Sequence, residues 1–411
     1  MTKKIVITGL GATSPLGGTA TDTWNALLAG ESGASPLDYE WVERTSLPVT
    51  FAAQARVRPT DVLARHETKR LDPSSQFALI AGREAWADAG MPAVEPDRLA
   101  VDWATGIGGV WTLLDAWDTL RERGPRRVLP MTVPMLMPNG PGAAIGMDLH
   151  ARAGITTVVS ACASSTESLV NAYNRLQAGL ADVVIAGGSE AAIHPLPIAS
   201  FAAMQALSKR NDDPATASRP YDLTRDGFVL GEGAAALVVE TEEHALARGA
   251  HIYAELLGGS VTSDAYHITA PDPEGSAAAR AMVATIRNAG ADLSDVMHIN
   301  AHATSTPVGD IAEYNAMRRV FGDLLEGIPI SATKASTGHL LGGAGAIEAF
   351  FTVKALAERM LPPTINLTEQ DPAIPLDVVT SPRALGAGDL LAISNSFGFG
   401  GHNAVVAFRS V

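Results

Sequence analysis

The sequence predicts an α/β fold made of two related halves, which we place at residues 1–250 and 251–411. Short runs of β-branched residues alternate with Ala-rich helical stretches, a pattern typical of buried strands covered by helices. The length of 411 residues also exceeds what one ordinary core accommodates, which fits a duplicated fold. Two pairs of segments repeat between the halves: 158–165 resembles 299–306, and 231–239 resembles 400–408.

Six strands and five helices follow from this pattern. Each predicted strand is a short apolar or β-branched run that is bounded by small or polar residues. In the second helix, Leu169, Tyr173 and Leu176 fall at helical spacing, and Gly179 suits a C-terminal cap. In chain order, the strands are 4–8, 156–160, 182–186, 234–240, 297–300 and 390–394, and the helices are 74–89, 164–178, 276–288, 310–320 and 345–357.

Composition and charge exclude several classes of protein. With 46% hydrophobic and 18% charged residues, the chain has the composition of a globular protein rather than a disordered one. Its net charge of −14 disfavours binding to nucleic acid or to an anionic membrane, since both need a positive face. The single cysteine excludes an internal disulfide and a Cys-based zinc site, and no apolar run reaches the ~18 residues of a membrane span. We therefore expect a soluble cytoplasmic protein that binds no nucleic acid and no membrane.

Cys162 is the first candidate catalytic residue. It follows a predicted strand and precedes a predicted helix, where unpaired backbone N–H groups and the positive end of the helix dipole meet. Both features favour the thiolate, so we expect a lowered pKa for this thiol. Its small neighbours Ala161, Ala163 and Ser164 leave room for a substrate. The alternative is a buried structural cysteine.

Two histidines and a lysine could join Cys162. His302 ends a predicted strand, and His339 lies in a loop that leads into a Gly-rich helix. Small residues flank both histidines, so each could face a cavity; a capping or core role is the alternative. Lys334 follows the apolar segment 328–333, which favours a buried, paired lysine over a solvated one. The spacing alone does not show that these four side chains meet.

The segment 395–403 is rich in glycine and phenylalanine. Glycine permits tight turns and exposes backbone N–H groups, so this segment is either an ordinary hairpin turn or a mobile binding loop.

Two other patterns do not support a binding site. The segment 9–17 resembles a dinucleotide-binding loop, but its third glycine is misplaced and Pro15 interrupts the turn. The histidines lack metal-binding spacing, so we expect no cofactor and no metal site.

Together these motifs resemble the β-ketoacyl-[acyl-carrier-protein] synthases of the thiolase superfamily, most closely the bacterial type II elongating synthases (KAS II). The resemblance covers nearly the whole chain, and the motifs occur in register. The matching segments are VITGLG (6–11), SACAS (160–164), SRPYD (218–222), RDGFV (225–229), GEGA (231–234), His302, 334–339 and NSFGFGGHN (395–403).

The resemblance implies a thiolase-like fold of duplicated αβαβα layers, usually in a dimer. The N-terminal half would carry the nucleophile and the insertions for cap and dimer, and the C-terminal half the His, Lys, His and gating-loop residues. It also implies an acyltransferase that condenses malonyl-carrier protein with an acyl group. Cys162 would hold the acyl chain, while His302 and His339 would assist loss of carbon dioxide. The backbone N–H groups of Cys162 and Phe399 would form the oxyanion hole.

Further roles also come from the resemblance. Lys334 would be structural or electrostatic and held by Glu348, and Phe399 matches a gating phenylalanine supported by Phe397. Three residues match substrate-pocket positions, namely Ile107, Thr304 and Thr306, although plain core packing is the alternative for Ile107. The acyl carrier protein is acidic, like this chain, so docking needs local basic residues. The candidates are Arg65, Lys69, Arg70, Arg126, Arg127, Lys209 and Arg210; Arg126 and Arg127 are favoured, and a solvated surface is the alternative for each.

Two departures from the family pattern stand near the site. Ala303 replaces the glycine usual after the active-site histidine, and Ser165-Thr166 stands where Ser-Gly or Gly-Ala is common. We expect Ser165 near the pocket or the dimer interface, where it would affect substrate preference rather than the reaction.

Four functions remain in competition. The first is a homodimeric synthase II that elongates fatty acyl chains. The second is the ketosynthase (KSα) subunit of a type II polyketide or polyene system, paired with a chain-length-factor partner that lacks the cysteine. A Cys-His acyl hydrolase is disfavoured by the paired histidines with Lys334, and a non-catalytic subunit is disfavoured by Cys162.

Overall fold

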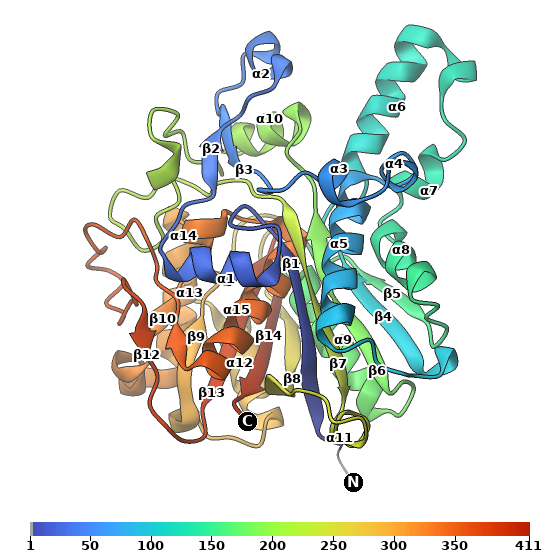
Figure 1. The fold of residues 1–411 in the computed structure, drawn as a ribbon. Helices are drawn as coiled ribbons and strands as arrows, with labels where there is room; N and C mark the ends of the chain where they lie inside the picture. Colours follow the sequence, from blue (N-terminus) through green and yellow to red (C-terminus); the bar gives the residue numbers. More distant parts are fainter. Residues whose placement is uncertain (1–2) are drawn as a thin grey trace.

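The computed structural model describes residues 3–411 and centres on a ten-stranded mixed sheet (Figure 1). The strand order is β10-β9-β13-β14-β8-β1-β7-β6-β4-β5. Five strands from the first part of the chain occupy one side, and five from the second part occupy the other. In each set the third strand is outermost, followed by the second, fourth, fifth and first. The two sets therefore repeat one topology, as a duplicated fold requires.

The elements have the following bounds. The strands of the large sheet are β1 (Ile5–Thr13), β4 (Leu99–Ala104), β5 (Ile155–Val158), β6 (Val183–Glu190), β7 (Gly233–Thr241), β8 (Ala254–Ser263), β9 (Val296–Asn300), β10 (Ile330–Ser331), β13 (Leu391–Gly398) and β14 (His402–Arg409). Two small sheets pair β2 (Ala34–Pro36) with β3 (Phe51–Ala53) and β11 (Met360–Leu361) with β12 (Arg383–Ala384). The longer helices are α1 (Ala20–Leu28), α5 (Pro73–Asp88), α6 (Val110–Arg123), α8 (Gly140–Asp148), α9 (Ser164–Gln177), α10 (Pro195–Ala203), α12 (Ser276–Asn288), α13 (Pro307–Phe321) and α15 (Ala344–Glu358). The short ones are α2 (Glu40–Thr45), α3 (Pro59–Val62), α4 (Arg65–Thr68), α7 (Thr132–Leu136), α11 (Glu242–Ala247) and α14 (Lys334–Thr337).

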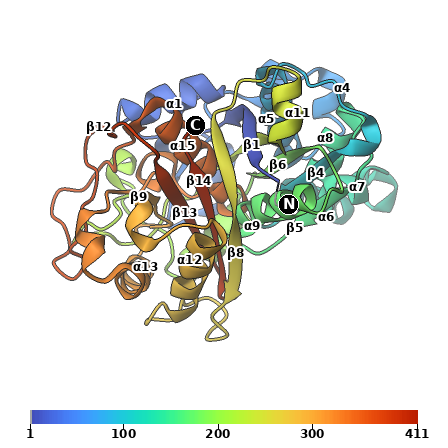
Figure 2. The same cartoon turned by 90° about the horizontal axis from the view of Figure 1, so that it is seen from below.

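Helices and strands stack in five layers. Helix α5 covers the outer face of β1, β6 and β7, and α12 covers the outer face of β8 and β14 (Figure 2). Helices α9 and α15 lie together between the two sets of strands, because α9 contacts β4, β6, β8 and β14, and α15 contacts β6, β7 and β13. Strands β1 and β8 pair only through Ile5–Ile7, so the two sets diverge beyond that point. The order is the αβαβα arrangement of a thiolase-like fold.

The two central helices explain why the core is so deeply buried. Every residue of α15 from Ala344 to Val353 is buried, as expected for a helix with apolar neighbours on all sides. Phe350 and Phe351 are fully buried there, and each such side chain stabilises the fold by about 1.5–3 kcal/mol. No helix among residues 3–411 combines the length and apolar character needed to cross a bilayer.

All six predicted strands and all five predicted helices are present, with ends that shift by a few residues. Four strands of the large sheet, β4, β8, β10 and β14, were not among the six. The sequence of β4 is LAVDWA and that of β8 is AELLGGSVTS, so neither shows a β-branched run. Their strand conformation comes from pairing between central neighbours, which overrides weak local preference.

Only one of the two sequence repeats joins segments that occupy equivalent places in the two sets of strands. The second repeat is right, because β7 and β14 occupy equivalent places in the two sets of strands. The first repeat pairs β5 with β9, although the counterpart of β5 is β10 and that of β9 is β4. The two segments look alike only because each runs from the end of a strand into a series of small residues. The boundary at residue 250 stays a prediction.

Candidate active site

The turn that carries Cys162 joins β5 to α9. The Ser164 hydroxyl closes this turn, since its Oγ accepts from the Ser160 N–H at 2.9 Å and donates to the Ala161 carbonyl at 2.5 Å. Ala161 has a φ of 51°, a left-handed conformation that a side chain strains. Gly398 passes so close that a Cβ there would lie 2.7 Å from the Ser160 carbonyl oxygen. The turn thus presents Cys162 to a cavity from a tightly fixed backbone.

The pKa of Cys162 differs from the sequence expectation. Burial raises the pKa of this thiol to about 11, although the charge of Lys334 and a hydrogen bond from the Phe399 backbone N–H both act to lower it. The prediction of a lowered pKa was therefore wrong, because loss of water around the sulfur outweighs the favourable helix end. The resting group at neutral pH is the thiol, and the carboxylates of Glu190 and Glu348 reinforce that preference.

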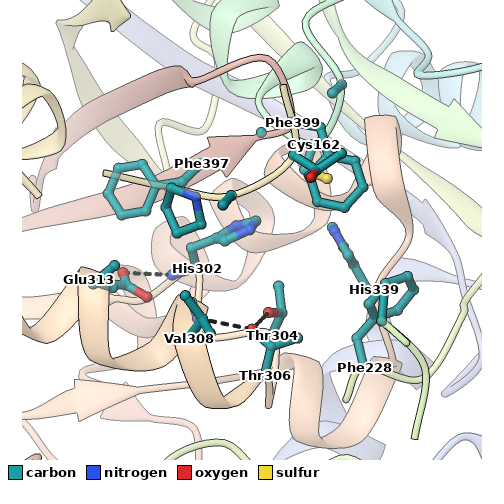
Figure 3. A pocket seen from close by; sticks show the side chains of 18 of the residues that line it. Cys162, Phe228, His302, Thr304, Thr306, Val308, Glu313, His339, Phe397 and Phe399 are labelled. Atoms are coloured by element: carbon teal, nitrogen blue, oxygen red, sulfur yellow. Dashed lines mark hydrogen bonds between the residues drawn. The ribbon is translucent and has the colours of Figure 1, made fainter. Parts of the chain in front are cut away.

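His302 and His339 meet beside Cys162 in the same cavity (Figure 3). Their ring centroids are 5.5 Å apart at an interplanar angle of 85°. Phe228 packs edge-on against His339 at 5.3 Å, and Phe397 lies 5.8 Å from His302. Burial first, and then the charge of Lys334, lowers the pKa of both histidines well below 6.5. Both rings are therefore neutral at pH 7.

Lys334 stands behind His302 and does not line the cavity. Its ammonium forms an ion pair with Glu348, and both side chains are 1% exposed. The same ammonium donates to the His302 carbonyl at 2.6 Å and lies 3.4 Å from His302 Nδ1. An ammonium can only donate, so Nδ1 acts as an acceptor and the ring proton resides on Nε2. Lys334 thus fixes which nitrogen of His302 can donate into the cavity.

The loop that holds His302 is anchored by a carboxylate that sequence reasoning missed. Glu313 of α13 accepts from the backbone N–H groups of His302 at 2.9 Å and Ala303 at 2.7 Å, and from the Asn395 amide at 3.1 Å. Ala303 has a φ of 20°, which explains why glycine is usual at this position. The available signal was an acidic residue on the buried face of a helix, beside Ala312 and Ala316.

The cavity has a volume of about 850 Å³ and a mostly apolar wall. Ile107, Thr304 and Thr306 line it, at positions where the resemblance implied a pocket. The other lining residues include Phe201, Leu207, Phe228, Leu341, Phe397 and Phe399. Ile107 is 40% exposed, which agrees with a pocket-lining position rather than core packing. A cavity of this size and character can hold an extended acyl chain.

The glycine-rich segment 395–403 forms a hairpin between β13 and β14. Its tip is Phe399–Gly401, in which both glycines have positive φ values of 84° and 75°. The tip is tied to the loop after β8, because the Gly400 N–H donates to the Ile268 carbonyl at 2.7 Å and Asn403 donates to Asp264 at 2.7 Å. The hairpin alternative therefore describes the geometry of this segment, and its tip places the Phe399 N–H on the thiol of Cys162.

The basic candidates occupy different environments. Arg65, Lys69, Arg70, Arg126, Arg127 and Lys209 are exposed. Lys209 also lines the cavity mouth. Arg210 is half-buried, and its guanidinium donates to the Thr224 carbonyl at 2.9 Å and hydroxyl at 3.1 Å. Arg210 is therefore committed to its own chain, unlike the other six.

The expected place of Ser165 was wrong. Ser165 and Thr166 are fully buried in the first turn of α9 and reach neither the cavity nor a surface. Ser165 Oγ accepts from the Ala346 N–H of α15 at 2.8 Å, and the Thr166 hydroxyl is 2.7 Å from that of Ser396 in β13. Because α9 lies between the two sets of strands, these hydroxyls link the nucleophile helix to the second half of the fold.

Comparisons with known proteins cover almost the whole chain. The model of the beta-ketoacyl synthase N-terminal domain matches residues 2–245, and that of the C-terminal domain matches residues 253–368. A 3-oxoacyl-[acyl-carrier-protein] synthase 2 from Mycobacterium bovis is 44% identical over 405 residues, or 98% of this chain and 96% of the relative. The enzyme of the same name from Staphylococcus aureus is 43% identical over 410 residues, or 99% and 98%.

Solved structures of ketosynthases have the same fold. One is described as a type II PKS acyl-carrier protein in complex with its ketosynthase bound to the hexaketide; it is 33% identical, with a TM-score of 0.92 and coverage of 100% of both chains. Another is the ishigamide ketosynthase/chain length factor, which is 29% identical, with a TM-score of 0.91 and the same coverage.

Proposed function

The chain belongs to the beta-ketoacyl synthase family, and we infer that it is a 3-oxoacyl-[acyl-carrier-protein] synthase that elongates fatty acyl chains. The observation that carries this inference is the meeting of Cys162, His302 and His339 in one buried cavity. The enzyme joins an acyl group to malonyl-carrier protein with loss of carbon dioxide. The steps below derive what each residue contributes.

Cys162 takes the acyl chain in the first step. Its sulfur forms a thioester with the acyl carbon, the bond to the carrier's sulfur breaks, and the thiol proton leaves with the released carrier thiol. A thiol serves here because sulfur both attacks and leaves readily. Because burial raises the pKa of the resting thiol to about 11, its proton must be removed during this step.

The neutral histidines act in the second step. Loss of carbon dioxide from malonyl-carrier protein leaves negative charge on the thioester oxygen, which N–H donors from His302 and His339 stabilise. A neutral imidazole donates a hydrogen bond without protonating the carbanion, and burial keeps both rings neutral. Lys334 supports this role by holding the His302 proton on Nε2.

The last step returns the enzyme to its thiol. The carbanion attacks the acyl carbon on Cys162, and the backbone N–H groups of Cys162 and Phe399 stabilise the oxygen of the tetrahedral intermediate. Loss of one such donor commonly raises the barrier by about 3–4 kcal/mol. The carbon–sulfur bond then breaks, the 3-oxoacyl group leaves on its carrier, and the Cys162 thiolate takes up one proton from solvent.

The partners are an acyl carrier protein and a second copy of the chain. Arg65, Lys69, Arg70, Arg126 and Arg127 offer exposed positive charge for the acidic carrier.

The edge of the sheet supports association with a second copy of the chain. Strand β5 forms an open end of the sheet, and Ile155 on it is 41% exposed. Helices α6 and α7 lie on the same side of the molecule as β5 (Figure 1). Trp117 of α6 is 55% exposed. An unpaired edge strand is usually covered, and pairing with a second β5 would cover it. A catalytic cysteine that must stay reduced further favours the reducing cytosol.

One observation favours a second candidate function. Two similar solved structures are a ketosynthase with its type II PKS carrier protein and a ketosynthase/chain length factor. In that reading, this chain is the KSα subunit, and a different chain covers β5.

The test is a condensation assay with the purified chain alone. Acyl-carrier protein and malonyl-carrier protein are supplied, products are followed by mass spectrometry, and Cys162→Ala is the control. We expect 3-oxoacyl-carrier protein and carbon dioxide from the wild type, and no 3-oxoacyl-carrier protein from the variant. An acylated wild type that never condenses supports the paired-subunit function; free acid as the product would mean a hydrolase and contradict the proposal.

A further inference from the structure

Glu190 is a buried carboxylate beside the cavity to which the mechanism assigns no task. It is the last residue of β6, is fully buried, and does not line the cavity. Its Oε1 accepts from the Thr105 hydroxyl at 3.0 Å and the Ile107 N–H at 3.3 Å. Its Oε2 accepts from the N–H groups of Gly106 at 2.7 Å and Gly342 at 3.1 Å. One carboxylate therefore satisfies four uncharged donors.

These donors come from two separate parts of the cavity wall. The turn after β4 contributes Gly106 and Ile107 to the wall, and the segment after α14 contributes His339 and Leu341. The two segments belong to opposite halves of the fold, and they touch: a Cβ on Gly342 would lie 2.0 Å from the Gly106 nitrogen. Glu190 is the acceptor that both segments share.

We propose that Glu190 is a positioning residue that fixes the shape of the acyl cavity by holding the Ile107 turn against the His339 segment. The inference rests on the proposed function, because it takes this cavity to hold the acyl chain. Burial raises the pKa of Glu190 to about 7, so this carboxyl is ionised above that pH. Hydrogen bonds to an ionised acceptor are about twice as strong as neutral ones, so the shared carboxylate then keeps both backbones rigid. A rigid wall discriminates between chains that differ by a few methylenes better than a loose one.

The charge of Glu190 also reaches the nucleophile. Burial is the main cause of the raised pKa of Cys162; Glu190 and Glu348 raise it further, and Lys334 lowers it. Removing the charge of Glu190 lowers the pKa of the thiol. This gives a readout that a purely structural defect would not produce.

The test uses Glu190→Gln, which keeps the shape but leaves a single accepting oxygen and no charge. The kcat/KM is measured with saturated acyl-carrier proteins of increasing length, and the rate of Cys162 alkylation by iodoacetamide is measured against pH. We expect the ratio between the preferred chain and one two carbons longer to fall by about threefold or more, and the alkylation midpoint to move to lower pH. An unchanged ratio would overturn the proposal, and an unchanged midpoint would contradict the action of Glu190 on the thiol.

Glu84→Gln is the matched control. Burial raises the pKa of Glu84 to about 7, as it does for Glu190, and Glu84 accepts from the backbone N–H groups of Ala12 and Ala20, both at 2.8 Å. It does not line the cavity. We expect this variant to change neither readout; if it narrows the ratio as Glu190→Gln does, the effect is general loosening and the proposal is wrong.

Two further arms keep the test decisive. If Glu190→Gln does not fold, Thr105→Val removes one donor to the same carboxylate but keeps its charge. It should narrow the ratio without lowering the alkylation midpoint, and an unchanged ratio would contradict the proposal. If the wild type accepts no acyl-carrier protein, the proposed function fails, while the alkylation midpoint still tests the action of Glu190 on the thiol.

Discussion

The buried Lys334–Glu348 pair makes a quantitative prediction about Lys334→Met. Both side chains are 1% exposed. Glu348 Oε1 pairs with the Lys334 ammonium, whereas Glu348 Oε2 has no hydrogen-bond partner among residues 3–411. The variant leaves Glu348 as an uncompensated buried carboxylate. Breaking a buried pair from one side costs about 3–5 kcal/mol in the free energy of unfolding. The double variant Lys334→Met, Glu348→Gln removes the stranded charge and should recover about 2 kcal/mol of that loss.

The pH dependence of this loss has a definite sign. Burial raises the pKa of Glu348 to about 7 even beside Lys334, and without the lysine the pKa rises further. A carboxyl with a raised folded-state pKa costs stability as pH rises from its unfolded value of 4.5, because the folded state resists ionisation. Lys334→Met should therefore lose more stability at pH 8 than at pH 6.

Urea unfolding followed by tryptophan fluorescence at both pH values measures these differences. The same variant should lose about 100-fold in malonyl decarboxylation, because His302 loses the group that sets its tautomer, but less than tenfold in acyl transfer to Cys162. Equal losses of stability in the single and double variants, or no difference between pH 6 and pH 8, would refute the argument.

Three other predictions concern separate parts of the molecule. His298 is buried without a hydrogen-bond partner for either ring nitrogen among residues 3–411, and burial lowers its pKa from 6.5 to about 3. The unfolded chain binds this proton and the folded one does not, so about 2 kcal/mol of stability is lost between pH 7 and pH 5; His298→Leu should remove that part in urea titrations, and an unchanged pH slope would contradict it. Ser165→Ala leaves the buried Ala346 N–H without its acceptor and should lower the free energy of unfolding by about 1–3 kcal/mol in the same assay. An unchanged free energy of unfolding would mean that this hydrogen bond does not stabilise the fold. Arg126→Ala with Arg127→Ala should raise the KM for acyl-carrier protein about fivefold with kcat nearly unchanged, an effect that high salt should abolish; a KM unaffected at low salt would place docking elsewhere.

The sequence was sufficient for elements whose local pattern and tertiary role agree. The strand before Cys162 and the helix after it show a clear switch of periodicity, and the structure forms both. Strand β8 was missed because its two central glycines weaken the local pattern, although pairing with β1 and β14 makes it a strand. Sequence patterns report local preference, and such pairing lies outside them.

The candidate site likewise contains residues that the sequence predicted and residues that it did not. Cys162, His302 and His339 were recognisable from small neighbours and motif order, and they do meet in space. Glu190 and Glu313 could not be recognised from the sequence. Each accepts hydrogen bonds from backbone N–H groups, and such bonds leave no motif of side chains in the sequence. The pKa of Cys162 was misjudged for a related reason. A helix end can be read from the chain, but the loss of water around the sulfur depends on segments from the other half.

The central claim is that Cys162 alone carries the acyl chain, and one mass measurement tests it most directly. The wild type and Cys162→Ala are incubated with acyl-carrier protein, and intact masses and peptide fragments are compared. The account predicts that the wild type gains one acyl group, located on the peptide that contains Cys162, and that the variant gains none. An acyl group on another residue, or an unmodified wild type with every carrier-bound donor, would contradict it.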